Sequence, residues 1–499
     1  MPDEIKISQL PALSFPVTGA ESIPFVQSGV TKVGAVSSLN TYLSSTFATI
    51  SSLNGYAALS TANTFTKTQT FASSAINIGN LPLSSTQSGS LFIGLSAGQS
   101  STGINSTFIG SHAGRATGAA NSNFFGLSAG VNARNAANSN FLGRNAGSSA
   151  TNACNSNFLG YSAGQSAINA YNSNFLGCNA GCNATNACFS NFLGYAAGKG
   201  AAYARYSNFL SSQAGQVATN ACFSNFLGAN AGRNATCAYK SNFLGYAAGK
   251  CAAYAYFSNF LGYKAGQYAT NASCSNFLGC NAGCAAANAS YSNFLGGNAG
   301  RSATNANNSN FLGANAGNSA TYACFSNFLG SQAGNSATNA CYSNFLGSFA
   351  GSVALSANNS NFLGSFAGQC ATYACKSNFL GGSAGCNATN ANNSNFLGYN
   401  AGRCATNARF SNFLGSFAGR GATNACHSTF IGLSAGFNAT GACNSIALGS
   451  CAIPTGPGQL VLGSAAHPLS TIPGASLVTS VSGLKVRING TFFTIPLLT

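Results

Sequence analysis

Cysteine and histidine are the residue types of this chain that most readily suggest chemistry. The sequence has 19 cysteines but only three histidines, and no two cysteines form a C-x-x-C pair. A zinc site needs such close pairs of ligands, so the spacing predicts no metal centre. The glycine-rich segments also lack the G-x-x-x-x-G-K-[ST] spacing of a phosphate-binding loop. We therefore expect neither a metal nor a cofactor.

Acid–base chemistry is disfavoured by the distribution of charge. The only acidic residues, Asp3, Glu4 and Glu21, lie at the start of the chain, and every charged side chain after them is Lys or Arg. The repeated part therefore lacks a carboxylate pair, and isolated histidines have no partners to orient them. We predict that the chain is not an enzyme.

Eight of the cysteines recur at one place, 15 residues after a repeated serine. They are Cys154, Cys188, Cys222, Cys324, Cys341, Cys375, Cys426 and Cys443. In stacked coils about 4.8 Å apart, Cys324 and Cys341 would be neighbours, as would Cys426 and Cys443. That spacing is within disulfide reach, although parallel Cβ directions do not suit the bond. The alternative, which we favour, is a column of small buried thiols that fill a tight interior.

Basic residues form a second recurring set, nine positions after the same serine. They are Arg115, Lys199, Arg233, Lys250, Arg301, Arg403 and Arg420. With a formal net charge of +16, a rod that carries them along one edge suits polyanionic partners such as acidic glycans, lipopolysaccharide or nucleic acid. Tyrosines at position 5 lie on the same side, and such mixtures bind sugars or nucleic acid. The alternative is that one sign of charge only keeps the rod soluble.

These residues are positioned by a strict repeat. The motif S-N-F-L-G-x-x-A-G-x-x-A-T-N-A-x-x recurs every 17 residues from Ser122 to Ser445, and two earlier units begin at Ser90 and Ser106. A fixed period of this length marks a solenoid, in which each unit buries its apolar face only by stacking on its neighbours.

The pattern within one unit predicts β-structure. Counting the serine as position 0, the run N-F-L alternates as a strand does, and the glycines at positions 4 and 8 suit corners. The run A-T-N-A is expected to form a second short strand. Two glycines per unit, with Asn and Thr throughout, work against a helix. The predicted fold is an all-β parallel β-solenoid with small β-rich terminal caps, about 105 Å long.

The direction of the phenylalanine at position 2 is the main open question. A narrow lumen suits Ala and Leu, which would leave the Phe column facing outward, as at Phe108, Phe158, Phe226, Phe294, Phe362 and Phe413. An exposed apolar stripe of this length must be covered, and a homotrimer is the simplest way to cover it. The alternative places Phe inside and Asn outside, and gives a monomeric rod. Asn at position 1 and Thr at position 12 would form ladders.

Four segments are expected. They are an attachment segment (1–45), linker strands (46–89), the solenoid (90–463) and a C-terminal cap (464–499) that includes a hairpin at Asn489-Gly490. The run K-I-S-Q-L-P-A-L, followed by V-Q-S-G-V-T-K, resembles the N-terminal segments of bacteriophage tail-fibre and other virion structural proteins. The later run T-A-N-T-F-T-K-T-Q-T-F-A is similar to the linker strands of phage side-fibre proteins. The final L-K-V-R-I-N-G-T-F-F-T-I-P-L-L is similar to the ends of phage and large-virus fibre proteins.

The run N-S-I-A-L-G-S at 444–450 resembles the coil signature of trimeric autotransporter adhesin heads, which are parallel β-rolls. These resemblances imply a viral fibre attached to virion or tail proteins through its N-terminal segment, with adsorption to an acidic host surface. A cell-surface adhesin, a self-assembling filament and an ice-binding solenoid are the alternatives. No signal peptide and no membrane span are evident, so we expect synthesis in the host cytoplasm and a place on the virion or outside the cell.

Overall fold

The computed structural model describes residues 89–115 and 117–467 with their side chains, together with the backbone of six further strands. These six are β1 (Ser22–Gln27), β2 (Val30–Ala35), β3 (Ile76–Ile78), β4 (Leu81–Ser84), β28 (Gly483–Ile488) and β29 (Thr491–Pro496). The chain divides into two units, Met1–Ile76 and Asn77–Thr499. Most of the expected attachment segment, linker and cap lies outside the described residues.

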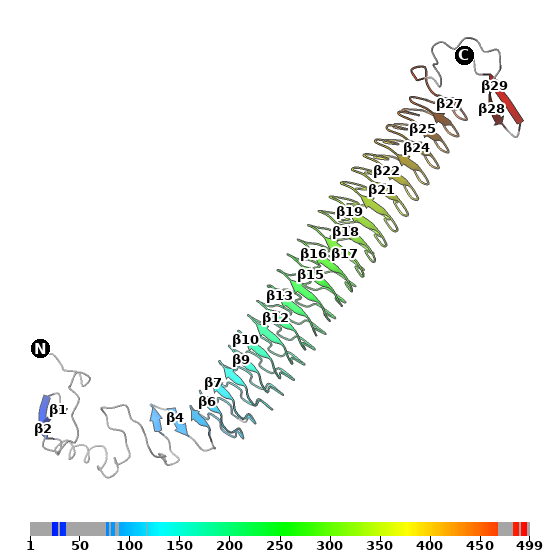
Figure 1. Cartoon of the computed structure of the whole chain (residues 1–499). Helices are drawn as coiled ribbons and strands as arrows, with labels where there is room; N and C mark the ends of the chain where they lie inside the picture. Colours follow the sequence, from blue (N-terminus) through cyan, green and yellow to red (C-terminus); the bar gives the residue numbers. More distant parts are fainter. Residues whose placement is uncertain are drawn as a thin grey trace. The chain divides into compact units, whose positions relative to one another are not determined.

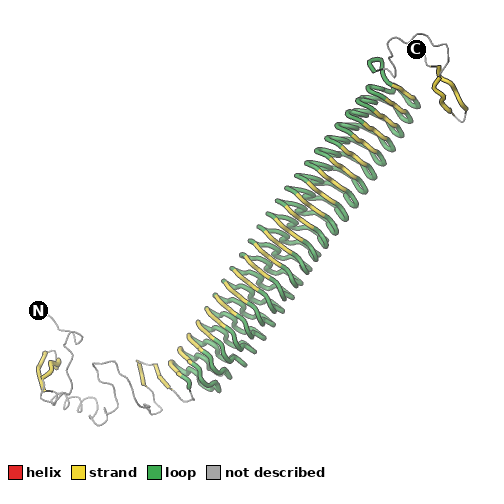
Figure 2. Tube along the Cα trace, viewed as in Figure 1, coloured by secondary structure: helices red, strands yellow, loops and turns green. Residues whose placement is uncertain are grey.

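The predicted parallel β-solenoid is confirmed. Each 17-residue unit makes one coil with one three-residue strand, and the strands stack in parallel and in register along a rod (Figures 1 and 2). Phe175, for example, pairs with Phe192 of the next coil. The stacked strands are β5 (Leu91–Ile93), β6 (Thr107–Ile109), β7 (Asn123–Phe125), β8 (Asn140–Leu142), β9 (Asn157–Leu159), β10 (Asn174–Leu176), β11 (Asn191–Leu193), β12 (Asn208–Leu210), β13 (Asn225–Leu227), β14 (Asn242–Leu244), β15 (Asn259–Leu261), β16 (Asn276–Leu278), β17 (Asn293–Leu295), β18 (Asn310–Leu312), β19 (Asn327–Leu329), β20 (Asn344–Leu346), β21 (Asn361–Leu363), β22 (Asn378–Leu380), β23 (Asn395–Leu397), β24 (Asn412–Leu414), β25 (Thr429–Ile431), β26 (Ile446–Leu448) and β27 (Leu460–Leu462).

Different pairings occur where the stack begins and ends. Strand β4 pairs antiparallel with β5 and so covers the first edge of the ladder. At the other end β27 adds one more parallel strand, although it follows β26 after a shorter segment than the repeat. Open strand edges invite pairing with other chains, so the covered first edge limits end-to-end growth. The hairpin expected at Asn489-Gly490 is present, because β28 and β29 pair antiparallel from Ile488 and Thr491 outward.

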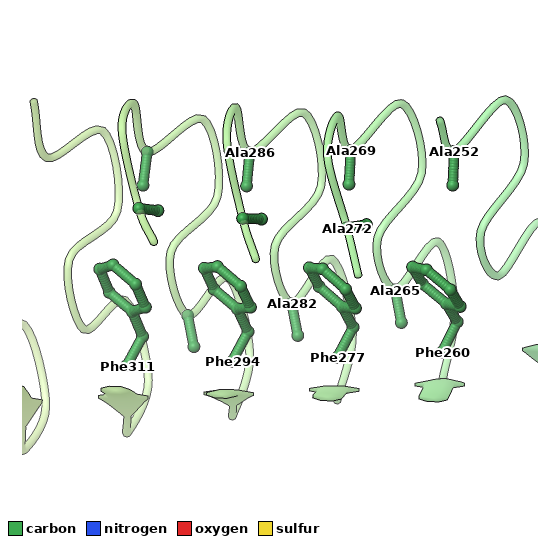
Figure 3. Close-up of a cluster of buried hydrophobic side chains, with 14 of the residues drawn as sticks. Ala252, Phe260, Ala265, Ala269, Ala272, Phe277, Ala282, Ala286, Phe294 and Phe311 are labelled. Atoms are coloured by element: carbon green, nitrogen blue, oxygen red, sulfur yellow. The ribbon is translucent and has the colours of Figure 1, made fainter. Parts of the chain in front are cut away.

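The expected outward direction of the phenylalanine column is wrong. All six residues proposed to face a partner chain have no exposed surface within a single chain, and they pack inside the coils. They are Phe108, Phe158, Phe226, Phe294, Phe362 and Phe413. Figure 3 shows the rings of Phe260, Phe277 and Phe294 stacked along the interior, with Ala269 and Ala286 on the opposite side of the lumen. The alternative orientation, Phe inside and Asn outside, is the one that the chain adopts.

The interior admits these rings because every other inward residue is small. Ala at positions 7, 11 and 14 surrounds each ring, as Ala265, Ala269 and Ala272 do in one coil. Consecutive rings are stacked at most steps, for example with centroids 4.7 Å apart between Phe260 and Phe277, whereas Phe345 and Phe362 meet edge to face. A flat ring that stacks on the rings of the neighbouring coils needs little more than the coil spacing, so one Phe per coil fits inside the lumen.

Serine at position 0 is also buried, and its hydroxyl forms hydrogen bonds with backbone N–H and C=O groups inside the coil. Ser224 has no exposed surface, and its Oγ accepts the amide N–H of Ser241 in the next coil at 3.0 Å. The same hydroxyl lies within hydrogen-bonding distance of the Cys222 carbonyl at 3.0 Å and of the Ala238 carbonyl. The column therefore satisfies polar groups that would otherwise be buried without partners.

The second strand expected at A-T-N-A is reduced to single bridges in some coils, such as Thr389 with Thr406. The backbone conformation of the residues on either side explains why a longer strand does not form. Positions 10 and 13 have the left-handed backbone conformation, as at Asn387 (φ 56°) and Asn390 (φ 51°). Only two residues between them can be extended, which is too short for a strand.

Candidate functional site

Asn at position 1 and Leu at position 3 form a continuous surface along the solenoid. Since the Phe between them points inward, both neighbours must point outward. Together they line an open groove of about 2210 Å³ that follows the strands from Asn123 to Ile431. None of the residues that line it carries a charge. We call this surface the Asn–Leu face.

The asparagines of this face form an amide ladder. Each Nδ2 donates to the Oδ1 of the next coil, for example from Asn242 to Asn259 at 2.8 Å and from Asn259 to Asn276 at 2.8 Å. The ladder continues through every coil from Asn123 to Asn412. These bonds occupy one donor and one acceptor of each amide and hold the face in one conformation.

The basic residues at position 9 lie along a different edge, which we call the basic edge. Arg115 and Arg301 are exposed, whereas Lys199, Arg233, Lys250, Arg403 and Arg420 are partly buried. The guanidinium of Arg233 donates to the side-chain oxygens of Gln213 at 3.1 Å and Asn230 at 3.3 Å. These neighbours are neutral, and none of the residues that the structure describes has an acidic side chain that could neutralise the edge.

Three thiols alternate with the cations of this edge. Cys182 is followed one coil later by Lys199, Cys284 by Arg301, and Cys386 by Arg403. Burial raises the pKa of all three thiols, while the adjacent cation acts in the opposite direction. The net shift is upward, so these thiols stay protonated at neutral pH and are poor nucleophiles.

The cysteine column at position 15 is mostly not buried. Only Cys188 is fully covered, which contradicts the favoured expectation of buried thiols. The structure joins Cys324 to Cys341 and Cys426 to Cys443 by disulfides, each with a Cα–Cα distance of 4.7 Å. The in-register stacking of identical positions is what brings each pair within reach.

Exposed aromatic residues at positions 15 and 16 form a surface that sequence reasoning did not identify. Phe189, Tyr206 and Phe223 stack with centroids 4.8 and 5.1 Å apart, and all three are more than 40% exposed. The guanidinium of Arg205 lies over Tyr206 at 5.7 Å, and Lys240 lies over Phe257 at 5.4 Å. Along the chain these positions look variable. The signal appears only when the repeats are aligned and compared position by position.

Comparison of the chain with known protein families, characterised proteins and solved structures gives no match. Within residues 89–115 and 117–467, no three His, Cys, Asp or Glu side chains gather where they could hold a metal ion. The described residues also contain no helix long and apolar enough to cross a membrane.

Proposed function

We propose that this protein is the shaft of a fibre that projects from a virion, assembled from three copies of the chain packed through their Asn–Leu faces. The observation that carries the proposal is the uncharged Asn–Leu face, which runs through consecutive coils without interruption. The terminal sequences that resemble viral fibre proteins supply the link to a virion, and the solenoid supplies the mechanical part.

The stack is suited to transmit force along its axis. Each coil is joined to the next by backbone hydrogen bonds on several sides, such as Asn242 N–H to the Ser258 carbonyl at 2.9 Å and Gly249 N–H to the Ala265 carbonyl at 2.7 Å. The stacked Phe interior and the Asn ladder follow the same axis. Repeats that contact only their neighbours make a rod whose length grows with the number of coils.

The Asn–Leu face has the properties of a contact between copies of the chain. Its leucines are at least partly exposed in the single chain, and Leu142 and Leu227 are each 36% exposed. A parallel copy has the same coil spacing, so a contact made in one coil is repeated in all the others. Three parallel copies around one axis also keep their attachment segments at the same end, as a fibre requires.

The native mass tests this assembly. We expect a particle of about three times 49.9 kDa by light scattering, and a rod by negative-stain electron microscopy. The substitutions Leu312→Glu and Leu329→Glu should dissociate it, because carboxylates would be buried in an apolar contact. The matched control is Asn318→Glu with Asn335→Glu, which adds the same charge to the same two coils at position 9. A monomeric unmodified chain would contradict the proposed packing.

The viral assignment needs a separate test. Immunogold electron microscopy with antibodies against the shaft should label projections on virus particles. Labelling of uninfected cell surfaces would instead support a cellular adhesin, and the fibre proposal would then fail even if the rod is trimeric.

A further inference from the structure

A trough interrupts the surface of the rod on the side formed by positions 13 to 16. Its volume is about 680 Å³. It is lined by Tyr254, Tyr256, Asn271, Ser273, Asn288, Ser290, Tyr291, Asn305, Asn307, Asn308, Tyr322 and Cys324. None of these residues lines the groove of the Asn–Leu face. We call this site the Tyr–Asn trough.

Two tyrosines in one column define the length of the trough. At position 13, Tyr254 and Tyr322 stand four coils apart, and Asn271, Asn288 and Asn305 occupy the three coils between them. The two rings are 55% and 56% exposed. Because the amides are shorter than the phenol rings, the surface is hollow over these three coils. The separation is about 19 Å at the spacing of stacked strands.

The floor of the trough is a hydrogen-bonded polar surface. Asn271 donates to Asn288 at 2.7 Å, and Asn288 donates to Asn305 at 2.8 Å. Beside them the Ser273 hydroxyl donates to Ser290 at 3.1 Å. Each amide in such a ladder retains a second N–H and a second oxygen lone pair. The floor therefore offers donors and acceptors at the regular spacing of the coils.

The trough carries no charge, although the chain carries 19 basic residues. Its lining has neither Lys nor Arg, and Cys324 is held in a disulfide with Cys341. A polyanion would gain nothing here from the net charge of the protein. A nucleic acid could stack its bases on the tyrosines, but its phosphates would find no cation in the lining.

Tyrosine with asparagine and serine is the composition that suits a neutral sugar chain. A pyranose ring has a C–H face that packs on an aromatic ring, and its hydroxyls both donate and accept hydrogen bonds. The trough meets both requirements. The C–H faces can pack on the tyrosines at its two ends and on Tyr291 between them, which is 64% exposed, and the hydroxyls can bond to the amides of the floor. The rigid stack and the disulfide at Cys324 fix this geometry before a ligand arrives, which lowers the entropic cost of binding.

We propose that the Tyr–Asn trough binds a neutral, unbranched oligosaccharide that lies along the axis of the rod. The proposal does not depend on the viral assignment or on the packing of the Asn–Leu faces, since the trough lies within one chain and shares no lining residue with that face.

Binding is tested by calorimetry and saturation-transfer NMR on the full chain with cellotetraose, maltotetraose and chitotetraose. We expect at least one of them to bind, and the pair Tyr254→Ala with Tyr322→Ala to weaken that binding by about tenfold or more, as the loss of a stacking ring does. Asn288→Gly keeps the left-handed backbone (φ 52°) but removes the central amide, and should also weaken binding.

The matched control is Tyr203→Ala with Tyr373→Ala. Both tyrosines stand at position 13 and are exposed to similar extents, 55% and 62%, but neither lines the trough. These substitutions should leave the affinity unchanged. An equal loss in the control pair, an unchanged affinity in the trough pair, or binding to none of the three tetrasaccharides would each overturn the proposal. Circular dichroism of the variants checks that the stack is intact.

Discussion

Backbone conformation at single residues explains much of the repeat. Besides the glycines, positions 6, 10, 13 and 16 have positive φ in coil after coil, as at Asn179 (φ 56°), Asn183 (φ 58°) and Asn186 (φ 48°). Asn tolerates this conformation better than most side chains do. The asparagines that look like a compositional bias along the chain therefore mark the corners of the coil.

Position 4 requires glycine more strictly, and one coil breaks that rule. At Gly160 φ is 130°, and a Cβ there would meet the backbone of Gly177 in the next coil. Ser211 occupies this position with φ 115°. The bond from Gly228 N–H to the Leu210 carbonyl beside it is 3.1 Å, against 2.8 Å for the equivalent bond from Gly245. The coil that holds Ser211 is thus joined to the next one at this point by a longer hydrogen bond.

Replacing this serine should stabilise the solenoid. We expect Ser211→Gly to raise the free energy of unfolding of the surrounding coils by about 1–3 kcal/mol, because the strained conformation costs about that much. Gly245→Ser is the matched control and should lower it by a similar amount. Hydrogen exchange followed by mass spectrometry measures both effects locally. Unchanged exchange around Ser211 in the glycine variant would show that the coil is not strained there.

Most of the elements could be predicted from the sequence, but which side chains of the strand N-F-L face the interior could not. The period, the strand N-F-L and the corners at Gly160 and Gly164 are visible because spacing alone determines them. Alternation along a strand shows only that Phe and its two neighbours lie on opposite faces. Side-chain volume was therefore the basis for predicting which face lies inside the coil. The choice of Leu and Ala for the interior assumed that a Phe ring is too large for the lumen. It overlooked that stacked rings occupy one coil spacing each, as between Phe277 and Phe294 at 4.8 Å.

Whether a surface can be recognised in the sequence depends on how its residues recur from coil to coil. The basic edge is visible in the sequence because its seven members share one position and one charge. The Tyr–Asn trough is defined by contrast between coils, with Tyr254 and Tyr322 at the two ends of three asparagines. A repeat consensus averages that contrast away. The difference between Tyr and Asn at this position shows a trough only once the stacking of the coils is known.

The Phe column should dominate the stability of the elements. Phe277 is fully buried, whereas Leu278 next to it lies on the Asn–Leu face. We expect Phe277→Ala to destabilise its coil and the adjacent ones by about 3–5 kcal/mol, because the ring leaves a cavity that the surrounding alanines cannot fill.

Leu278→Ala provides the comparison on the neighbouring residue. In the separated chain it should change the stability by no more than about 0.5 kcal/mol. Local hydrogen exchange is the suitable measurement, since a stack of repeats opens in parts rather than all at once. Equal effects of the two substitutions would mean that the stacked rings contribute little beyond the backbone ladder.

At the scale of the whole molecule, the solenoid has three distinct surfaces. The Asn–Leu face is uncharged and continuous, the basic edge concentrates cations, and the Tyr–Asn trough is local and neutral. Contact between copies through the first would leave the second available to the surroundings. The absence of carboxylates from residue 22 onward means that no acidic side chain of the solenoid competes with an external anion for these cations.

The basic edge is therefore expected to bind acidic glycans in a way that depends on position as well as on net charge. Arg233 and Lys250 stand in consecutive coils of the edge, and replacing both by Gln should weaken heparin binding roughly 2- to 30-fold, because two ion pairs at the protein surface are lost. The matched variant Arg205→Gln with Lys240→Gln removes the same charge from positions 15 and 16. If the edge is the binding surface, only the first variant elutes from immobilised heparin at clearly lower salt. Equal shifts would instead show that net charge alone attracts the polyanion, and that the alignment at position 9 serves solubility.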